Sequence, residues 1–234
     1  MSDQQTQLIE IHATFVEKIN FACHQSAFAV LRELKIENLQ EVDVDALTVT
    51  LEASPAFFKR KTWTVDLISA GGVMPLRDRD IELDGGFLFE LTETMRGTVT
   101  LHVTRSCEVL AEQTVSVELL ACNEWGGSTY MPELLAAFCT PNDPTVDGLL
   151  GHAGKILKKA GKPLAIDGYK SGSREQVWLI ASALYSAITR MDLSYALPPS
   201  SFEYNGQKIR LPSSIGTSKV ATCLDTTLLF AAAF

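Results

Sequence analysis

The sequence ends with the stretch Val220-Ala221-Thr222-Cys223-Leu224-Asp225-Thr226-Thr227-Leu228-Leu229-Phe230-Ala231-Ala232-Ala233-Phe234, which predicts a helix that begins beside Thr222. Thr222 can cap this helix, and Asp225, three residues later, can bond back to the cap, as in a capping box. The residues after Asp225 are almost all apolar, so we expect the body of the helix to be buried. The stretch has no Gly, Pro or polar last turn as a stop signal. We therefore expect these residues to be a fragment of a longer protein.

This register places Cys223 in the first turn of the predicted helix. Unpaired backbone N–H groups and the positive end of the helix dipole lie there. They favour a thiolate, which is the nucleophilic form of cysteine. Cys223 is therefore the candidate catalytic residue. Free cysteines are also among the most buried residue types, and the Asp225 carboxylate, one turn away, opposes thiolate formation, so a small buried side chain is the alternative interpretation.

Composition limits the class of protein. A length of 234 residues suits one large domain or two ordinary ones, and 46% hydrophobic residues are enough for real cores. No apolar run approaches the roughly 20 residues that a transmembrane helix needs. The polar residues 1–7 lack the pattern of a signal peptide. The sequence therefore predicts a cytoplasmic protein without a membrane-spanning helix.

Cysteine spacing and charge exclude further classes. The five cysteines are scattered and form no C-x-x-C pair, which argues against a zinc site and against a disulfide framework. Reduced thiols in a cytoplasm are the simplest account of them. A formal net charge of −8 argues against a broad face that binds a phosphate backbone. Direct binding of nucleic acid by this chain is therefore not expected.

The first half of the chain has the alternation of half-buried strands. Apolar residues alternate with Thr, Glu or Ser, and Gly-rich turn signals separate the runs. Several short strands at this spacing predict an antiparallel, Ig-like β-sandwich over residues 1–120. A short helical turn is expected at residues 88–93. A spacer or recognition module without chemistry is the simplest role for such a unit. The predicted strands cover residues 12–16, 46–51, 62–67, 97–103 and 113–119.

Residues 121–127 interrupt the alternation and are interpreted as a linker, with Trp125 as a packing residue. From residue 128 to 234 the apolar period is helical, so the second domain is predicted to be mainly helical. Asp143 or Thr145 can cap one of its helices. An Asn-Gly turn at Asn205 predicts a β-hairpin over residues 202–210. The predicted helices run through residues 132–138, from 143 or 145 to 160, and from 173 to 191.

Three further patterns in the sequence could indicate a binding or catalytic site. Residues 148–155 superficially resemble a phosphate loop, but the first glycine is misplaced and Ile156 replaces the required Ser or Thr. No nucleotide site is therefore predicted there. The predicted hairpin carries Gln207, Lys208 and Arg210 just before Cys223. These residues have two interpretations: a functional one, in which they contact an anionic partner or hold the loop in place, and an ordinary solvated face. The four histidines share no metal-ligand spacing, and no metal is predicted: His12, His24, His102 and His152.

Five motifs, in order, resemble the N-terminal region of large bacterial helicase-related proteins of superfamily one. The resemblance covers roughly residues 50–234 and is most specific from Trp125 onward. In that family a sandwich and a transglutaminase-like segment precede a helicase ATPase. The motifs are residues 123–127, Phe138 with 141–144, Gly168-Tyr169, residues 198–202 with 206–212, and 222–225.

The resemblance implies a papain-like, transglutaminase-type core that is incomplete at its C-terminus, with Cys223 at the nucleophile position. The family has Gly-Thr-Cys-Leu-Asp where this chain has Ala221-Thr222-Cys223-Leu224-Asp225, a mild departure. The partner histidine of that family would lie beyond Phe234. ATP and Mg²⁺ would belong to the motor of the full-length protein, so no cofactor is expected in this chain.

The sequence therefore supports an α+β protein of two domains with two candidate functions. The first is a non-motor accessory or recognition region, in nucleic-acid processing or defence, whose partner is the downstream helicase region of the same chain or another protein. The second is a cysteine-dependent acyl-transfer enzyme of the protease or transglutaminase type, with Cys223 as nucleophile and inactive in this fragment. Without its base and orienting group a cysteine is poorly activated.

Overall fold

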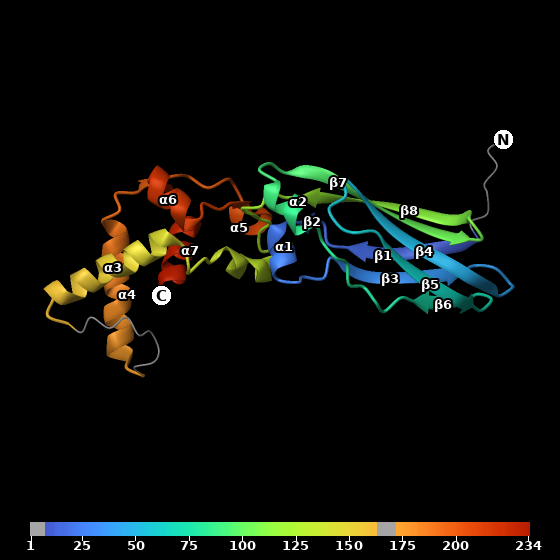
Figure 1. The fold of residues 1–234 in the computed structure, drawn as a ribbon, viewed down its shortest axis with the longest axis horizontal. Helices are drawn as coiled ribbons and strands as arrows, with labels where there is room; N and C mark the ends of the chain where they lie inside the picture. Colours follow the sequence, from blue (N-terminus) through green and yellow to red (C-terminus); the bar gives the residue numbers. More distant parts are fainter. Residues whose placement is uncertain (1–7, 163–171) are drawn as a thin grey trace. The chain divides into compact units, whose positions relative to one another are not determined.

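The alternating first half and the helical second half of the sequence fold into two separate units. The computed structural model describes residues 8–162 and 172–234 and has a mixed α+β architecture with several antiparallel sheets (Figure 1). The first unit is Met1–Cys122 and the second is Asn123–Phe234. In the described residues, no helix has both the length and the apolar character needed to cross a membrane.

Two sheets make up the first unit. One has the order β1-β3-β6, with antiparallel pairs, and the other has the order β2-β8-β7-β4-β5, in which only the β2–β8 pair is parallel. Strand β1 packs against β8 and β7 of the second sheet. The three-stranded sheet comprises β1 (Ile9–Phe15), β3 (Leu31–Asn38) and β6 (Val73–Pro75). The five-stranded sheet comprises β2 (Lys18–Ile19), β8 (Glu108–Leu119), β7 (Met95–Arg105), β4 (Val44–Ser54) and β5 (Lys61–Ile68).

The register of the central strands explains the apolar alternation in the sequence. Val49 of β4 lies opposite Val103 of β7, and Leu51 lies opposite Leu101. All four side chains are fully buried. Because successive side chains point to opposite faces of a strand, the residues between them, Thr50 and His102, lie on the other face. This paired apolar stripe forms part of the core of the first unit.

Two short helices accompany the sheets. Helix α1 (Phe21–Gln25) is capped by the side chain of Asn20, and α2 (Gly85–Glu90) is capped by Asp84. The helical turn expected at residues 88–93 is thus present but begins three residues earlier. Strand β3 was not predicted, because its residues 31–38 mix charged and apolar side chains without clean alternation.

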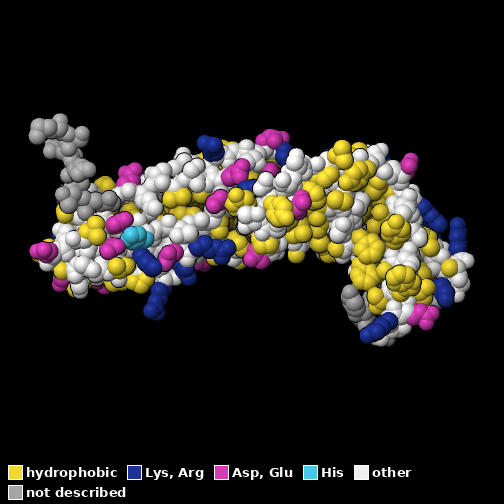
Figure 2. All heavy atoms as spheres, turned by 180° about the vertical axis from the view of Figure 1, so that it is seen from behind, with side chains coloured by type: hydrophobic (Ala, Val, Ile, Leu, Met, Phe, Trp, Pro, Cys, Tyr) yellow, Lys and Arg dark blue, Asp and Glu magenta, His cyan; other side chains and the backbone are white. Residues whose placement is uncertain are grey.

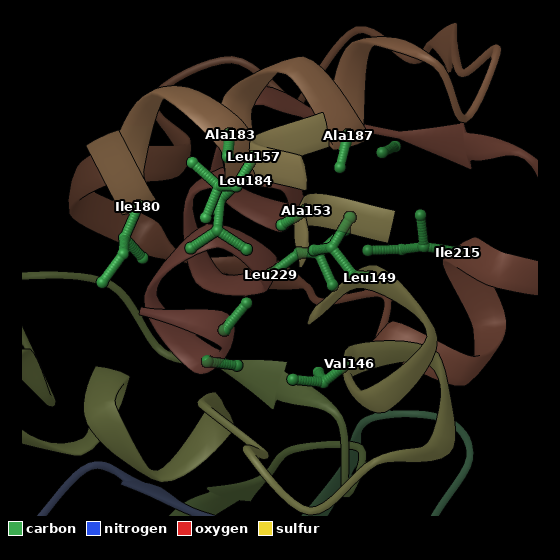
Figure 3. Close-up of a cluster of buried hydrophobic side chains, with 13 residues drawn as sticks. Val146, Leu149, Ala153, Leu157, Ile180, Ala183, Leu184, Ala187, Ile215 and Leu229 are labelled. Atoms are coloured by element: carbon green, nitrogen blue, oxygen red, sulfur yellow. The ribbon is translucent and has the colours of Figure 1, made fainter. Parts of the chain in front are cut away.

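In the second unit, helices surround a single apolar cluster. This cluster includes Leu149 and Ala153 of α3, Leu184 of α4 and Leu229 of α7, all of them buried (Figure 3). Asp143, one of the two predicted caps, begins α3, and Ser173 caps α4, the helix that was predicted to follow it. The helices are η1 (Pro132–Phe138), α3 (Pro144–Lys159), α4 (Arg174–Thr189), α5 (Phe202–Asn205), α6 (Pro212–Ser218) and α7 (Cys223–Ala233).

Short strand pairs tie distant parts of the second unit together. Strand β9 (Glu124–Trp125) pairs with β11 (Gln207–Lys208), and β10 (Ser194–Tyr195) pairs in parallel with β12 (Val220–Ala221). The linker predicted at residues 121–127 therefore contains a strand of the second unit. Trp125 is buried, and its Nε1 donates to the carbonyl of Met131 at 2.8 Å.

The hairpin predicted over residues 202–210 is wrong. Phe202–Asn205 form the helical turn α5, and Gly206 ends it with a φ of 93°. The strand that follows pairs with residues 124–125 and not with its own neighbours. Asn-Gly supplies a left-handed backbone both to hairpins and to helix ends, so the dipeptide alone did not distinguish them.

Candidate functional site

The start of α7 forms the capping box that the sequence predicts. The Asp225 backbone N–H donates to the Thr222 hydroxyl oxygen at 3.2 Å, and the Thr222 N–H donates to the Asp225 carboxylate at 2.8 Å. Both side chains are buried. This reciprocal pair fixes the first turn and thereby the position of Cys223, its first helical residue.

The negative charge of Asp225 is compensated within the site. Its carboxylate is fully buried and accepts from the Arg210 backbone N–H at 2.9 Å and from the Arg210 guanidinium at 3.3 Å. Arg210 therefore holds the segment before α6 against the α7 cap, as one of the two sequence interpretations expected. An ion pair at this carboxylate reduces its repulsion of a thiolate at Cys223.

Cys223 is exposed. The structure therefore excludes the alternative in which this residue is a small buried side chain. Its backbone carbonyl accepts from the hydroxyls of Thr226 and Thr227, at 2.9 and 2.8 Å. A thiol at the first position of a capped helix is both accessible and close to unpaired backbone N–H groups.

Tyr195 is the neighbour of the Cys223 thiol. The parallel pairing of β10 with β12 sets Tyr195 opposite Ala221, two residues before Cys223. Desolvation, and then the negative charge of Cys223 and its hydrogen bond, raise the pKa of the Tyr195 hydroxyl. At neutral pH the phenol is therefore a neutral hydrogen-bond donor. No local signal predicts this pairing, because it joins two dipeptide strands about 25 residues apart.

A buried amide lies on the other side of the cap. Gln207 is 3% exposed, and its Nε2 donates to the Thr222 hydroxyl at 3.2 Å. Within the described structure its Oε1 is buried without a hydrogen-bond partner. An unsatisfied buried polar atom is uncommon and costs stability. The sequence pattern places Gln207 on a hairpin that the structure does not contain, so its burial beside the α7 cap was not predicted.

No histidine in the described residues is joined to Cys223 by a hydrogen bond or an ion pair. His12, His24 and His102 belong to the first unit, and His152 lies on α3 of the second. The arrangement thus presents a thiol, a phenol and an amide without an evident general base. A thiol held in this way can be alkylated or acylated, but its activation requires a base.

The structure places the residues that resemble a phosphate loop, and it also brings together a group that the sequence did not predict. Residues 148–155 lie inside α3 and do not form a loop, so their backbone N–H groups bond within the helix and cannot cradle a phosphate. In the first unit, Glu10, His12 and Glu37 bring their ligand atoms within 4.8 Å of one another.

The Glu10–His12–Glu37 group is the described set with the chemistry to hold a metal ion. Sequence spacing missed it because Glu37 comes from β3, directly opposite Glu10 of β1. His12 Nε2 and Glu37 Oε2 are 2.8 Å apart. This contact already accounts for the arrangement in the absence of an ion.

Comparison with known proteins adds no family assignment. No protein-family model matches the chain, and no curated protein matches it. The residues, their geometry and the resemblance of the five sequence motifs to helicase-related proteins are therefore the basis for any functional assignment.

Proposed function

We propose that this chain is a non-motor accessory region of a bacterial helicase-related protein that acts in nucleic-acid processing or defence. Its first unit would be an Ig-like β-sandwich, and its second a transglutaminase-like segment. In this proposal the second unit recognises a protein surface, and the surface is the downstream helicase region of the same chain.

The main support for this proposal is a pair of exposed aromatic side chains on one face of α4. Trp178 is 72% exposed and Tyr185 is 66% exposed. Residues seven apart lie on one side of a helix, and the core residues Ile180 and Leu184 occupy the opposite side. Leu197, which follows β10, is 87% exposed. Figure 2 shows hydrophobic side chains gathered on one face of the second unit.

Exposed aromatic side chains of this kind favour a protein partner. Trp and Tyr are enriched at the centres of protein interfaces, where they supply large apolar contact areas. Clustered exposed apolar groups on a protein surface mark interaction sites. The net charge of −8 argues against a phosphate backbone as the main partner.

A photo-crosslinking experiment on the full-length protein tests this proposal. p-Benzoylphenylalanine replaces Trp178, and the irradiated protein is digested and analysed by mass spectrometry. We expect crosslinks from position 178 to peptides of the helicase region. The matched control places the same amino acid at Val42, which is 62% exposed in the first unit. Absence of crosslinks from position 178, or equal crosslinking from position 42, would contradict the proposal.

A cysteine-dependent acyl-transfer enzyme is the second candidate, because Cys223 is exposed at a capped helix N-terminus beside Tyr195. Cys223 would attack an amide or ester carbonyl, expel its amine or alcohol, and form a thioester that water or an amine then resolves. The base would have to come from outside the described residues.

Activity-based labelling distinguishes the two candidates. The full-length protein is treated with iodoacetamide near neutral pH, and the labelling rates of Cys223 and the exposed Cys107 are compared. An enzyme requires Cys223 to react much faster than Cys107, and Cys223→Ala to abolish amide or ester turnover. Equal labelling rates, together with turnover that is unchanged in Cys223→Ala, would exclude Cys223 as a catalytic nucleophile. The accessory role would not be affected by that result.

A further inference from the structure

A cavity of about 770 Å³ lies in the second unit, away from the Cys223 site. Its walls are the largely exposed side of α3 that carries Gly148, His152 and Lys155, the C-terminal end of α4, and α6 with the residue after it. Cavities of this volume are large enough for small organic ligands. Neither Cys223 nor Tyr195 lines the cavity, so it does not belong to the site described above.

The charge of the cavity is of one sign. His152, Lys155 and Lys159 lie along one side of α3, and Arg190 and Lys219 extend the same lining from α4 and the α6–β12 turn. No acidic side chain lines the cavity in the part of the chain that the structure describes. Among the described residues, none of these five side chains forms an ion pair with an acidic side chain.

Ordinary helix-end stabilisation accounts for only part of this charge. Lys159 and Arg190 lie at the C-terminal ends of their helices, where a cation interacts favourably with the dipole. Lys219 is the C-terminal cap residue of α6 and has the same favourable position. Lys155 lies in the body of α3, so the dipole does not explain it. The Asp143 carboxylate contacts Ser213 at the edge of the cavity. It accepts hydrogen bonds from neutral donors, Ser213 and the Thr145 N–H, so it keeps its negative charge at the edge of the cavity, outside the lining.

The remaining wall is apolar. Leu149, Ile156 and Met191 line it, and the hydroxyls of Thr145 and Thr217 lie among them. We propose that this cavity binds a small phosphate monoester whose body is apolar or aromatic. The cations would bind the phosphate, since several lysine and arginine side chains complement a dianion. The apolar wall would cover the body of the ligand.

The probe for this proposal is 1-naphthyl phosphate, which joins an aromatic body to a phosphate. Binding to the whole 234-residue chain is measured by the fluorescence of the probe and by titration calorimetry. Inorganic phosphate tests the head alone, and 1-naphthol tests the body alone. We expect saturable binding of the probe at one site, at least about ten times tighter than either half, and weaker at high salt.

A pair of glycines on α3 provides a matched test of location. A Cβ atom built on Gly148 or on Gly151 meets nothing within 4 Å, but only Gly148 lines the cavity. Gly148→Leu should therefore project a side chain into the cavity and weaken probe binding at least about tenfold, whereas Gly151→Leu should leave binding unchanged. Both substitutions replace a glycine in a helix and are expected to preserve the fold.

A second pair tests the charge. Arg190→Gln removes a lining cation and should weaken binding of the probe at least about tenfold. Lys158→Gln removes an exposed cation of α3 that does not line the cavity and should change affinity less than about twofold. Circular dichroism verifies that each variant is folded.

Three results would overturn the proposal. They are the absence of saturable probe binding by the unmodified chain, unchanged binding in Gly148→Leu, and inorganic phosphate that binds as tightly as the probe. The last result would indicate a surface cluster of cations and not a cavity that selects a phosphate monoester. None of these measurements depends on the helicase-related role or on the reactivity of Cys223.

Discussion

At the scale of single residues, burial decides what each thiol can do. Cys223 and Cys107 are exposed, whereas Cys23, a residue of α1, is fully buried. The Asn20 side-chain oxygen accepts from the Cys23 N–H at 3.2 Å and lies 3.5 Å from its sulfur. Burial raises the pKa of the Cys23 thiol to about 11. The buried thiol of Cys23 therefore ionises less readily than an ordinary cysteine, whereas the thiols of Cys107 and Cys223 are accessible to reagents.

The shifted pKa of Cys23 predicts a loss of stability at alkaline pH. In the unfolded chain a thiol ionises near pH 8.5, but in the folded protein it keeps its proton to about pH 11. Below pH 8.5 both states hold the proton, so the contribution to stability is constant. Above it, unfolding releases a proton, and the free energy of unfolding should fall by about 3 kcal/mol towards pH 11.

Urea unfolding of the wild type and of Cys23→Ala between pH 7 and 10.5 measures this contribution. The substitution should remove most of the additional alkaline slope, although it lowers stability at pH 7 through lost packing. Cys107→Ala, at an exposed position, should follow the wild-type curve. If the curves of the wild type and Cys23→Ala stay parallel up to pH 10.5, the pKa of Cys23 is not raised.

At the scale of elements, the second unit depends on close contact between two backbone segments. A Cβ atom on Gly206 would lie 1.8 Å from the carbonyl oxygen of Trp125, and one on Gly127 would lie 2.1 Å from that of Tyr204. Both glycines also have positive φ, 93° and 85°. Only glycine fits this approach, which brings Gln207 to the cap of α7.

Gly206→Ala should therefore destabilise the second unit by about 3 kcal/mol or more, because it adds a backbone clash to an unfavourable φ. Gly151→Ala is the matched control: its Cβ meets nothing within 4 Å in a helix, and it should raise stability by about 0.5–1 kcal/mol. Thermal unfolding followed by circular dichroism compares the two. A Gly206→Ala protein as stable as the wild type would show that these segments are not in close contact.

Local signals in the sequence predicted the elements better than their partners. The cap Thr222 was identified correctly, and Asp143 was one of two caps predicted for α3, since a cap and the turn it begins are adjacent in the chain. The cap at Thr222 also predicted that Cys223 is the first residue of the helix. Its neighbour Tyr195 could not be predicted, because that contact depends on the pairing of strands far apart in sequence.

At the scale of the whole molecule, each unit has a core of its own. The first is built from strands, with Leu101 of β7 fully buried, and the second from helices, with Leu184 of α4 fully buried. The units divide at residues 122 and 123. Units with separate hydrophobic cores can in principle fold independently, so stability here is expected to have two components.

Differential scanning calorimetry of core variants tests this division. Leu101→Ala and Leu184→Ala each remove a buried side chain and should each cost about 2–5 kcal/mol. We expect two transitions. Leu101→Ala should lower the midpoint temperature of one and Leu184→Ala that of the other, because each substitution leaves a void in a different core. Leu67→Ala and Leu197→Ala, at positions 47% and 87% exposed, should move neither transition by more than a small amount. A single transition that both core substitutions lower equally would mean that the two units unfold as one, and the crosslinking and cavity experiments would then have to be interpreted for a single cooperative unit.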